Sequence, residues 1–122
     1  MEMNGVMVGS EDPTRLAEYY TKIFGEPAMS EDGFSGWKLG SAWLTVYAHD
    51  QVTGKNAQPG RVMWILESAD VQGDFDRFKS AGASVVLEPY HPQEDPSMLV
   101  ATFADPDDNY FQLMSPAPEM SK

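Results

Sequence analysis

The sequence has no cysteine, only 2 histidines, and 8 basic residues against 19 acidic ones. The absence of cysteine excludes disulfide bonds, thiolate metal sites and cysteine nucleophiles. The formal net charge of −11 argues against nucleic-acid and membrane-surface partners, because phosphate groups would be repelled, although it permits a cationic ligand. A plainer interpretation, that the charge only aids solubility, stays open. No apolar run approaches a membrane span and the N-terminus has no basic–apolar signal, so we expect a cytoplasmic protein.

What the sequence does contain is enough apolar material for a packed core. Hydrophobic residues make up 42% and aromatic residues 11% of the 122 positions, so disorder throughout the chain is not expected. A chain of this length forms one domain, or two small halves that share a core.

The first half of the chain predicts a strand, a helix and three more strands. The first strand is expected over residues 3–8. Asp12 then caps a helix with Pro13 in its first turn, where the missing N–H costs nothing, and Gly25 supplies the C-terminal cap. The three later strands are expected around Phe34, at 37–39 and at 42–48.

The same order repeats after a polar stretch, 49–60, that is rich in turn-forming residues. Asp70 opens a second helix and therefore holds the place of Asp12, as Phe78 holds that of Tyr20. The strands of this half are expected at 61–67, 84–87, 99–103 and 110–114. We divide the chain into a first module (1–50), a linker (51–60), a second module (61–116) and a tail (117–122).

The end of the second module carries the most informative segment, residues 104–113. Asp105 and Pro106 begin a tight turn, because proline presets φ and the Asp and Asn residues that follow tolerate a left-handed backbone. Alternation after the turn predicts a strand that places Gln112 on the face opposite Phe111 and Leu113. A polar side chain on that face marks a place where a binding or metal site would lie.

Three passages together resemble the vicinal oxygen chelate superfamily, which includes glyoxalase I, extradiol dioxygenases, and fosfomycin- and bleomycin-resistance proteins. They run over residues 6–25, 63–83 and 103–113, and the last resembles the family's Asp-Pro-Asp-Gly-Asn terminus. The resemblance implies an α+β fold in which two βαβββ modules form a curved mixed sheet around a cleft, with the helices outside.

The resemblance also implies where metal ligands would stand in a catalytic member. Two positions that are usually histidine fall on Gly5 and Met63, and the customary glutamate falls on Gln112. A position on the fourth strand falls near Trp43 or Thr45. Glycine has no donor, a thioether is a poor ligand for hard ions, and one amide oxygen does not hold a divalent ion against water. We therefore expect no metal, no cofactor and no catalytic residue.

Strand alternation then predicts what lines the cleft. We expect ligand-binding side chains at Met7, Trp43, Thr45, Tyr47, Met63, Ile65, Glu67, Tyr110, Gln112 and Met114. On the fourth strand the alternative register, with Leu44 and Val46 facing in, stays open. Methionine adapts its shape and aromatic rings offer flat faces, so this lining suits a flat or cationic small molecule. A collapsed cleft filled by the same side chains is the alternative.

These expectations favour a metal-free small-molecule binding protein, similar to bleomycin-resistance members. A lyase, isomerase or dioxygenase of the same superfamily is the alternative function, and a domain without a ligand is a third. His49 and His91 have no partner at ligand spacing and are expected to lie in surface loops. We expect a homodimer, because the sheets have exposed edges and because members of the family that the sequence resembles commonly dimerise.

Overall fold

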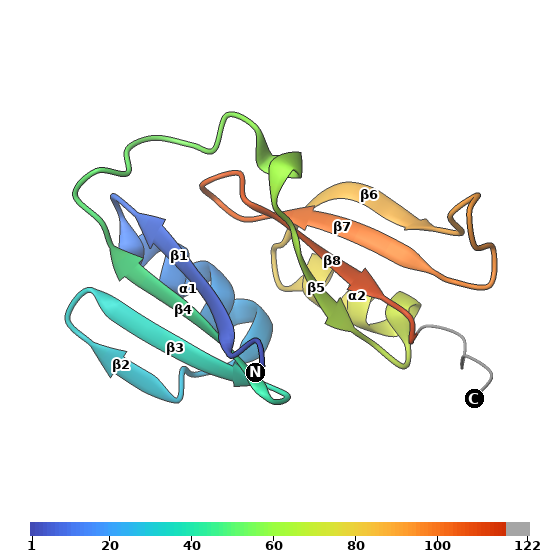
Figure 1. Ribbon diagram of the computed structural model, residues 1–122, viewed down its shortest axis with the longest axis horizontal. Helices are drawn as coiled ribbons and strands as arrows, with labels where there is room; N and C mark the ends of the chain where they lie inside the picture. The colour runs from blue at the N-terminus through green and yellow to red at the C-terminus, as the bar shows by residue number, and fades with distance from the viewer. Residues whose placement is uncertain (117–122) are drawn as a thin grey trace.

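The computed structural model describes residues 1–116, so the predicted tail at 117–122 lies outside the described residues. Each half of the chain forms a four-stranded sheet with one helix (Figure 1). The first half contains β1 (Gly5–Ser10), α1 (Pro13–Phe24), β2 (Met29–Glu31), β3 (Phe34–Leu39) and β4 (Ala42–Ala48). A 3₁₀ turn, η1 (Pro59–Arg61), precedes β5 (Trp64–Glu67), α2 (Val71–Ser80), β6 (Ser84–Tyr90), β7 (Val100–Ala104) and β8 (Tyr110–Met114). This confirms the predicted α+β fold of two βαβββ modules.

The strand order is the same in both sheets, β1-β4-β3-β2 and β5-β8-β7-β6. In each sheet the first strand pairs in parallel with the last, and the other pairs are antiparallel. The two sheets are separate, and β1 and β5 are the edge strands that border the gap between them in Figure 1.

Both helices begin and end where capping chemistry predicts. A carboxylate oxygen of Asp12 accepts a hydrogen bond from the Arg15 N–H at 3.1 Å, and Asp70 accepts one from the Gly73 N–H at 3.0 Å. At the end of α1, Gly25 has a φ of 88° and donates its N–H to Thr21 at 2.8 Å. Only glycine adopts such a φ without strain, so this predicted cap is confirmed.

The strand predictions need correction at five places. The first strand starts and ends two residues later than 3–8, and the strand predicted at 84–87 continues to Tyr90. The runs around Phe34 and at 37–39 form one strand, β3, because Gly36 continues the ladder without a break. The strand that was missed is β2, which is short and exposed and has no apolar alternation to mark it. The fifth strand begins at Trp64, since the proline-led 3₁₀ turn occupies the residues where a start at Arg61 was predicted.

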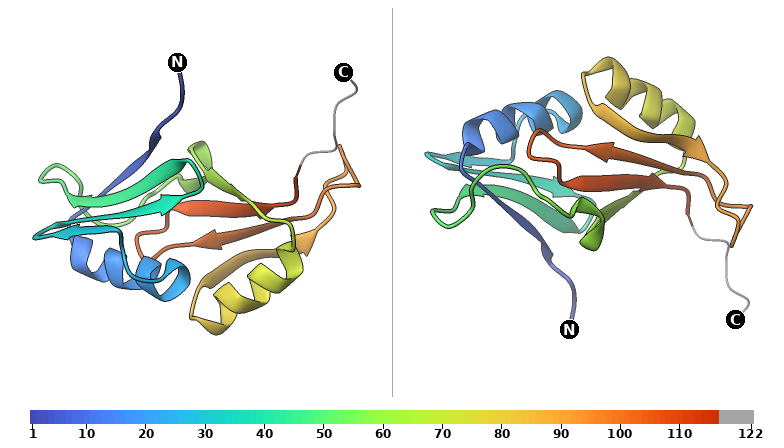
Figure 2. Two further views of the ribbon diagram at one scale, coloured as in Figure 1. Left: turned by 90° about the horizontal axis from the view of Figure 1, so that it is seen from below. Right: turned by 90° about the horizontal axis from the view of Figure 1, so that it is seen from above.

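The core lies between the helices and one face of each sheet. Figure 2 shows both helices on the same side of the two sheets. Tyr20 of α1 is completely buried and its ring packs against Phe111 of β8, with ring centroids 5.9 Å apart. Since α1 belongs to the first module and β8 to the second, the modules share one core. No helix among the residues described is long and apolar enough to cross a membrane.

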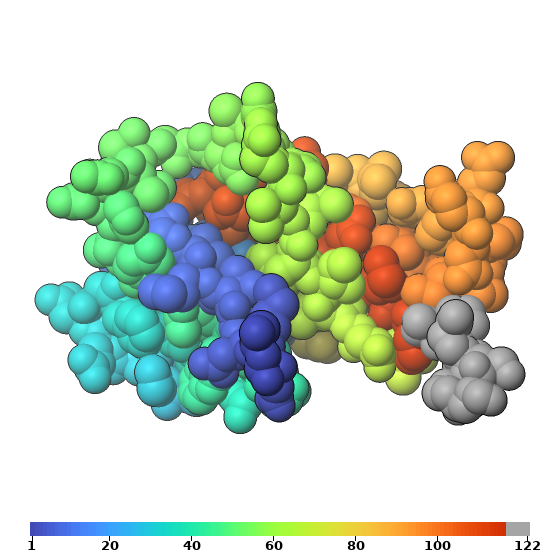
Figure 3. All heavy atoms as spheres, viewed as in Figure 1, coloured from blue at the N-terminus to red at the C-terminus, as the bar shows by residue number. Residues whose placement is uncertain are grey.

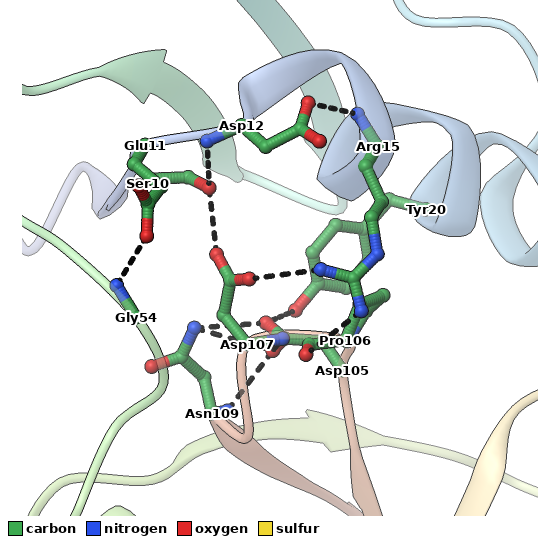
Figure 4. Close-up of polar contacts among 10 residues, drawn as sticks. All are labelled: Ser10, Glu11, Asp12, Arg15, Tyr20, Gly54, Asp105, Pro106, Asp107 and Asn109. Atoms are coloured by element: carbon green, nitrogen blue, oxygen red, sulfur yellow. Dashed lines mark hydrogen bonds and ion pairs between the residues drawn. The ribbon is translucent and has the colours of Figure 1, made fainter.

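The turn between β7 and β8 binds the start of the first module (Figure 4). Asp107 accepts a hydrogen bond from the Ser10 hydroxyl at 2.6 Å and lies 3.7 Å from the Arg15 guanidinium. Arg15 also donates to the carbonyl of Pro106 at 3.3 Å. We call these contacts, with those of Asp105 below, the junction network.

Asp105 is the buried centre of the junction network, with 3% of its surface exposed. It accepts hydrogen bonds from the N–H groups of Asp107 and Asn109, both at 2.9 Å, and from the Tyr20 hydroxyl at 2.7 Å. Burial raises the pKa of Asp105 above its ordinary value, and these hydrogen bonds oppose that rise. Asp108 has a φ of 63°, so the predicted turn chemistry of this segment is confirmed.

Candidate functional site

The faces of the two sheets that point away from the helices carry most of the predicted ligand-binding residues. The pairings Met7 with Thr45 and Ile65 with Gln112 place these side chains together across neighbouring strands. Leu44 and Val46 are buried beneath α1, so the open question about the fourth strand is settled. We call this helix-free side the open face; it carries Met7, Trp43, Thr45, Tyr47, Ile65, Glu67, Tyr110, Gln112 and Met114.

The open face is apolar and accessible rather than collapsed. Met7 exposes 65% of its surface and Ile65 exposes 53%. Apolar side chains that only filled a core would be buried, so the filled-cleft alternative is wrong for these two residues. Met63 is also exposed, but it precedes β5 instead of lying within it. Val62 is 76% exposed, because the strand starts after it.

A hollow of about 340 Å³ opens at the junction of the modules, between β1, the linker and the β7–β8 turn. Figure 3 shows it between the linker (green) and β1 (blue), with the turn (red) behind. Of the predicted site residues, Met7 and Tyr110 line this junction hollow, whereas the others do not. Its linker wall, which includes Lys55 and Asn56, was missed, because a turn-rich linker gives no sign of the place where it folds back.

Trp64 forms part of the wall of the junction hollow and holds an unsatisfied donor. Its ring stacks on Phe111 with centroids 4.7 Å apart, while its buried indole N–H has no hydrogen-bond partner among residues 1–116. Buried polar groups are nearly always paired, so this N–H is an exception, but it is sealed from solvent and is not open to a ligand in the hollow.

The positions at which the superfamily implies metal ligands do not fit a metal here. A Cβ built at Gly5 would collide with the backbone carbonyl of Trp43, so the backbone leaves no room for a ligating side chain. Gln112 donates its amide to the Thr102 hydroxyl at 3.1 Å, which orients it within the sheet. Thr45, the neighbour of Met7 on the fourth strand, points its hydroxyl at the carbonyl of Val6 at 3.4 Å.

Within residues 1–116, no three His, Cys, Asp or Glu side chains are grouped so that they could hold a metal ion. His49 lies after β4, where its ring nitrogen accepts from the Gln51 N–H at 3.1 Å. His91 lies in the loop after β6, with a ring nitrogen 2.8 Å from the carbonyl of Met98. Both histidines are therefore in loops, as predicted, and each is engaged locally.

The two-module arrangement is also found in known proteins. Residues 5–114 match the sequence model of the glyoxalase-like domain. This chain belongs to the glyoxalase-like family. The match spans both modules, and it supports the predicted membership of the vicinal oxygen chelate superfamily. No curated protein matches the chain.

Solved structures agree with the glyoxalase-like fold. A glyoxalase-related enzyme from Fulvimarina pelagi is 17% identical, with a TM-score of 0.72 over 95% of this chain and 88% of the other. A glyoxalase/bleomycin resistance protein from Catenulispora acidiphila is 16% identical, with a TM-score of 0.73 over 94% and 99%. A glyoxalase/bleomycin resistance protein/dioxygenase from Nocardioides is 12% identical, with a TM-score of 0.74 over 100% and 89%. At these identities the likeness concerns the fold alone.

Proposed function

We propose that this glyoxalase-like chain is a metal-free small-molecule binding protein that holds a flat or cationic compound on its open face, beside the junction hollow. The observation that carries the proposal is the accessible apolar surface at Met7 and Ile65, which pair with Thr45 and Gln112 across neighbouring strands. Large exposed apolar side chains on a sheet are a cost unless something covers them.

The chemistry of the open face suits such a compound. The rings of Trp43, Tyr47 and Tyr110 offer flat stacking surfaces, and methionines adapt to irregular outlines. Glu67 is exposed on β5 and would pair with a cationic group.

The proposal includes a homodimer located in the cytoplasm. β2 and β6 end the two sheets on the outside, and β1 and β5 are also edges, so the fold offers unpaired backbone groups and apolar area to a second copy. Light scattering at micromolar concentration tests this. A dimer mass is expected, and a monomer mass would refute this part.

The binding test uses two probes, bleomycin and the planar cation ethidium, in calorimetric titrations and thermal-shift assays. We expect at least one probe to bind and raise the melting temperature. Met7→Gln should weaken that binding about tenfold, because it replaces an apolar contact by a polar one. Met29→Gln is the control for position, because Met29 is also exposed and shares the face of Met7 by register but lies on the opposite edge strand, far from the junction hollow. Binding of neither probe, or equal loss in both variants, would contradict the proposal.

A second measurement addresses the enzymatic alternative. The protein is dialysed against a chelator and then analysed for nickel, zinc, iron and manganese. The proposal expects less than stoichiometric metal, and a stoichiometric ion that survives the chelator would favour an enzyme.

A further inference from the structure

A second groove lies on the other side of the first sheet, between α1 and the β2–β3 hairpin. Its volume is about 560 Å³, which is within the range of small-molecule sites. It exists because α1 packs on β1, β3 and β4 and leaves β2 uncovered, so the sheet extends beyond the helix. The side of α1 that carries Thr14, Glu18 and Thr21 forms one wall, and Val46 lies at the floor. We call it the hairpin groove.

Ser35 is the unusual residue of the hairpin groove. It pairs with Val46 across the ladder and therefore points to the helix side, where it lines the groove. Its side chain and backbone together expose only 9% of their surface, yet its hydroxyl makes no hydrogen bond with any residue in the described part of the chain. Trp64 holds the one side-chain donor or acceptor within residues 1–116 that is both sealed from solvent and unpaired, so the Ser35 hydroxyl opens into the groove and is placed to bond a group that enters it.

The charge of the hairpin groove indicates what that group is. Four carboxylates line it, those of Glu18, Glu26, Glu31 and Asp32, against the single ammonium of Lys22. None of these five side chains forms an ion pair with another residue among positions 1–116. Their field therefore favours a cation, and the cation can also donate to the Ser35 hydroxyl oxygen.

We propose that the hairpin groove is a second binding site, separate from the open face, for a small aliphatic diamine or polyamine. One ammonium group donates to the Ser35 hydroxyl and lies among the carboxylates, and the alkyl chain lies on Ala17 and Pro27, which line the groove and are partly exposed. An inorganic cation would use the carboxylates alone, whereas an alkylammonium uses the carboxylates, the hydroxyl and these apolar side chains.

The test is a titration with 1,5-diaminopentane at about 0.15 M salt, where diffuse surface attraction is largely screened. Calorimetry gives the affinity, and amide chemical shifts give the location. We expect shifts confined to α1, β2 and β3. Ser35→Ala and Glu18→Gln should each weaken binding about tenfold, the usual effect of removing a hydrogen bond or charge from an ionic contact.

The matched control is Glu88→Gln, which removes the same charge from an exposed position on β6 of the other module. We expect it to change the affinity less than twofold. Equal weakening by Glu18→Gln and Glu88→Gln would overturn the proposal, as would an unchanged affinity in Ser35→Ala. Displacement of the diamine by an equal concentration of magnesium chloride would also overturn it.

Folding of the variants is checked by their amide spectra. Binding of bleomycin or ethidium at the open face should be unchanged by Ser35→Ala, so that failure here is distinguishable from failure of the proposed function. If Ser35→Ala does not fold, Ser35→Thr replaces it, because threonine keeps the hydroxyl and adds a methyl group that narrows the groove. A normal affinity in that folded variant would contradict the proposal.

Discussion

The beginnings of the two helices use the same local chemistry and then differ in one contact. Ser10 and Ser68 each precede the capping aspartate by two positions and accept a hydrogen bond from its N–H, at 3.0 and 3.1 Å. Both hydroxyls also donate to a carboxylate at 2.6 Å. For Ser68 that carboxylate is Asp74 of its own helix, whereas for Ser10 it is Asp107 of the other module.

The equivalent aromatic residues show the same asymmetry. Tyr20 and Phe78 hold matching places in the helices and are both buried. The ring of Phe78 packs on Phe103 of its own module and on Phe24 of the other, with centroids 5.5 and 5.7 Å apart. Tyr20 adds a hydrogen bond, because its hydroxyl donates to Asp105 of the other module. Both positions therefore contact the other module, and the Tyr20 hydroxyl adds a buried hydrogen bond that Phe78 cannot make.

The two modules are therefore alike in the hydrogen bonds that cap their own helices. They differ in the contacts that join one module to the other. The junction network fixes β1 against the β7–β8 turn, and this turn and β1 both line the junction hollow. Variants that separate the two kinds of contact test this view, and we take them from the largest expected effect to the smallest.

The largest effect is expected from Asp105→Ala. It leaves the N–H groups of Asp107 and Asn109 and the hydroxyl of Tyr20 without their acceptor, and the predicted loss in free energy of unfolding is about 3 kcal/mol. Asp74→Ala removes the corresponding local contact at a more exposed place and should cost about 1 kcal/mol. Urea denaturation measures both, and equal losses would remove the distinction between junction and cap.

Tyr20→Phe makes the first module resemble the second at this core position. We expect a loss of about 1.5 kcal/mol, because Asp105 loses a buried hydrogen bond while the ring packing stays. The reverse change, Phe78→Tyr, buries a hydroxyl and should also destabilise the protein. An unchanged stability of Tyr20→Phe in urea denaturation would show that the hydroxyl does not link the modules.

Ser10→Ala and Ser68→Ala should each cost about 1 kcal/mol, because each removes a contact at a helix start. They differ in where the effect appears. Hydrogen exchange should accelerate in the β7–β8 turn for Ser10→Ala and only within the second module's own helix for Ser68→Ala. The same exchange pattern in both variants would contradict the asymmetry.

The smallest effect concerns pH. The pKa of Asp105 is raised in the folded state, so the folded protein binds this proton more tightly than the unfolded chain does. The resulting contribution to the free energy of unfolding is complete at a pH below the ordinary pKa of 3.8. It is lost as the pH rises through the pKa of the folded state. The Asp105→Asn variant does not titrate there. The native protein should therefore gain stability relative to this variant as pH is lowered from about 7 toward about 4. A gain in the opposite direction would mean that Asp105 is stabilised as a carboxylate.

The sequence predicted those parts of the fold that local chemistry decides. The Asp12 and Asp70 caps, the Gly25 helix end and the position of Gln112 opposite the buried Phe111 and Leu113 all follow from spacing and residue type. The predicted strand boundaries were wrong where backbone hydrogen bonding, rather than apolar alternation, determines where a strand begins and ends. This is the case at β2 and at the start of β5.

The candidate site was predictable only in part. Alternation placed Met7 and Ile65 on the correct face, because period two follows directly from strand geometry. The linker wall of the junction hollow was not predictable, since Asn56 is held there by the carbonyl of Asp107 at 2.8 Å, a contact between distant segments. The hairpin groove depends on how far a helix covers a sheet, which the order of elements does not reveal.

The central claim, that the open face binds a ligand, is tested most directly by methyl NMR of the methionines. Met7 and Met114 lie on the open face, whereas Met98, which precedes β7, is buried and offers a ligand no surface. On titration with ethidium or bleomycin, the account predicts that the methyl signals of Met7 and Met114 move while that of Met98 stays. Movement of Met98 alone, or no movement of Met7 at saturating probe, would contradict it.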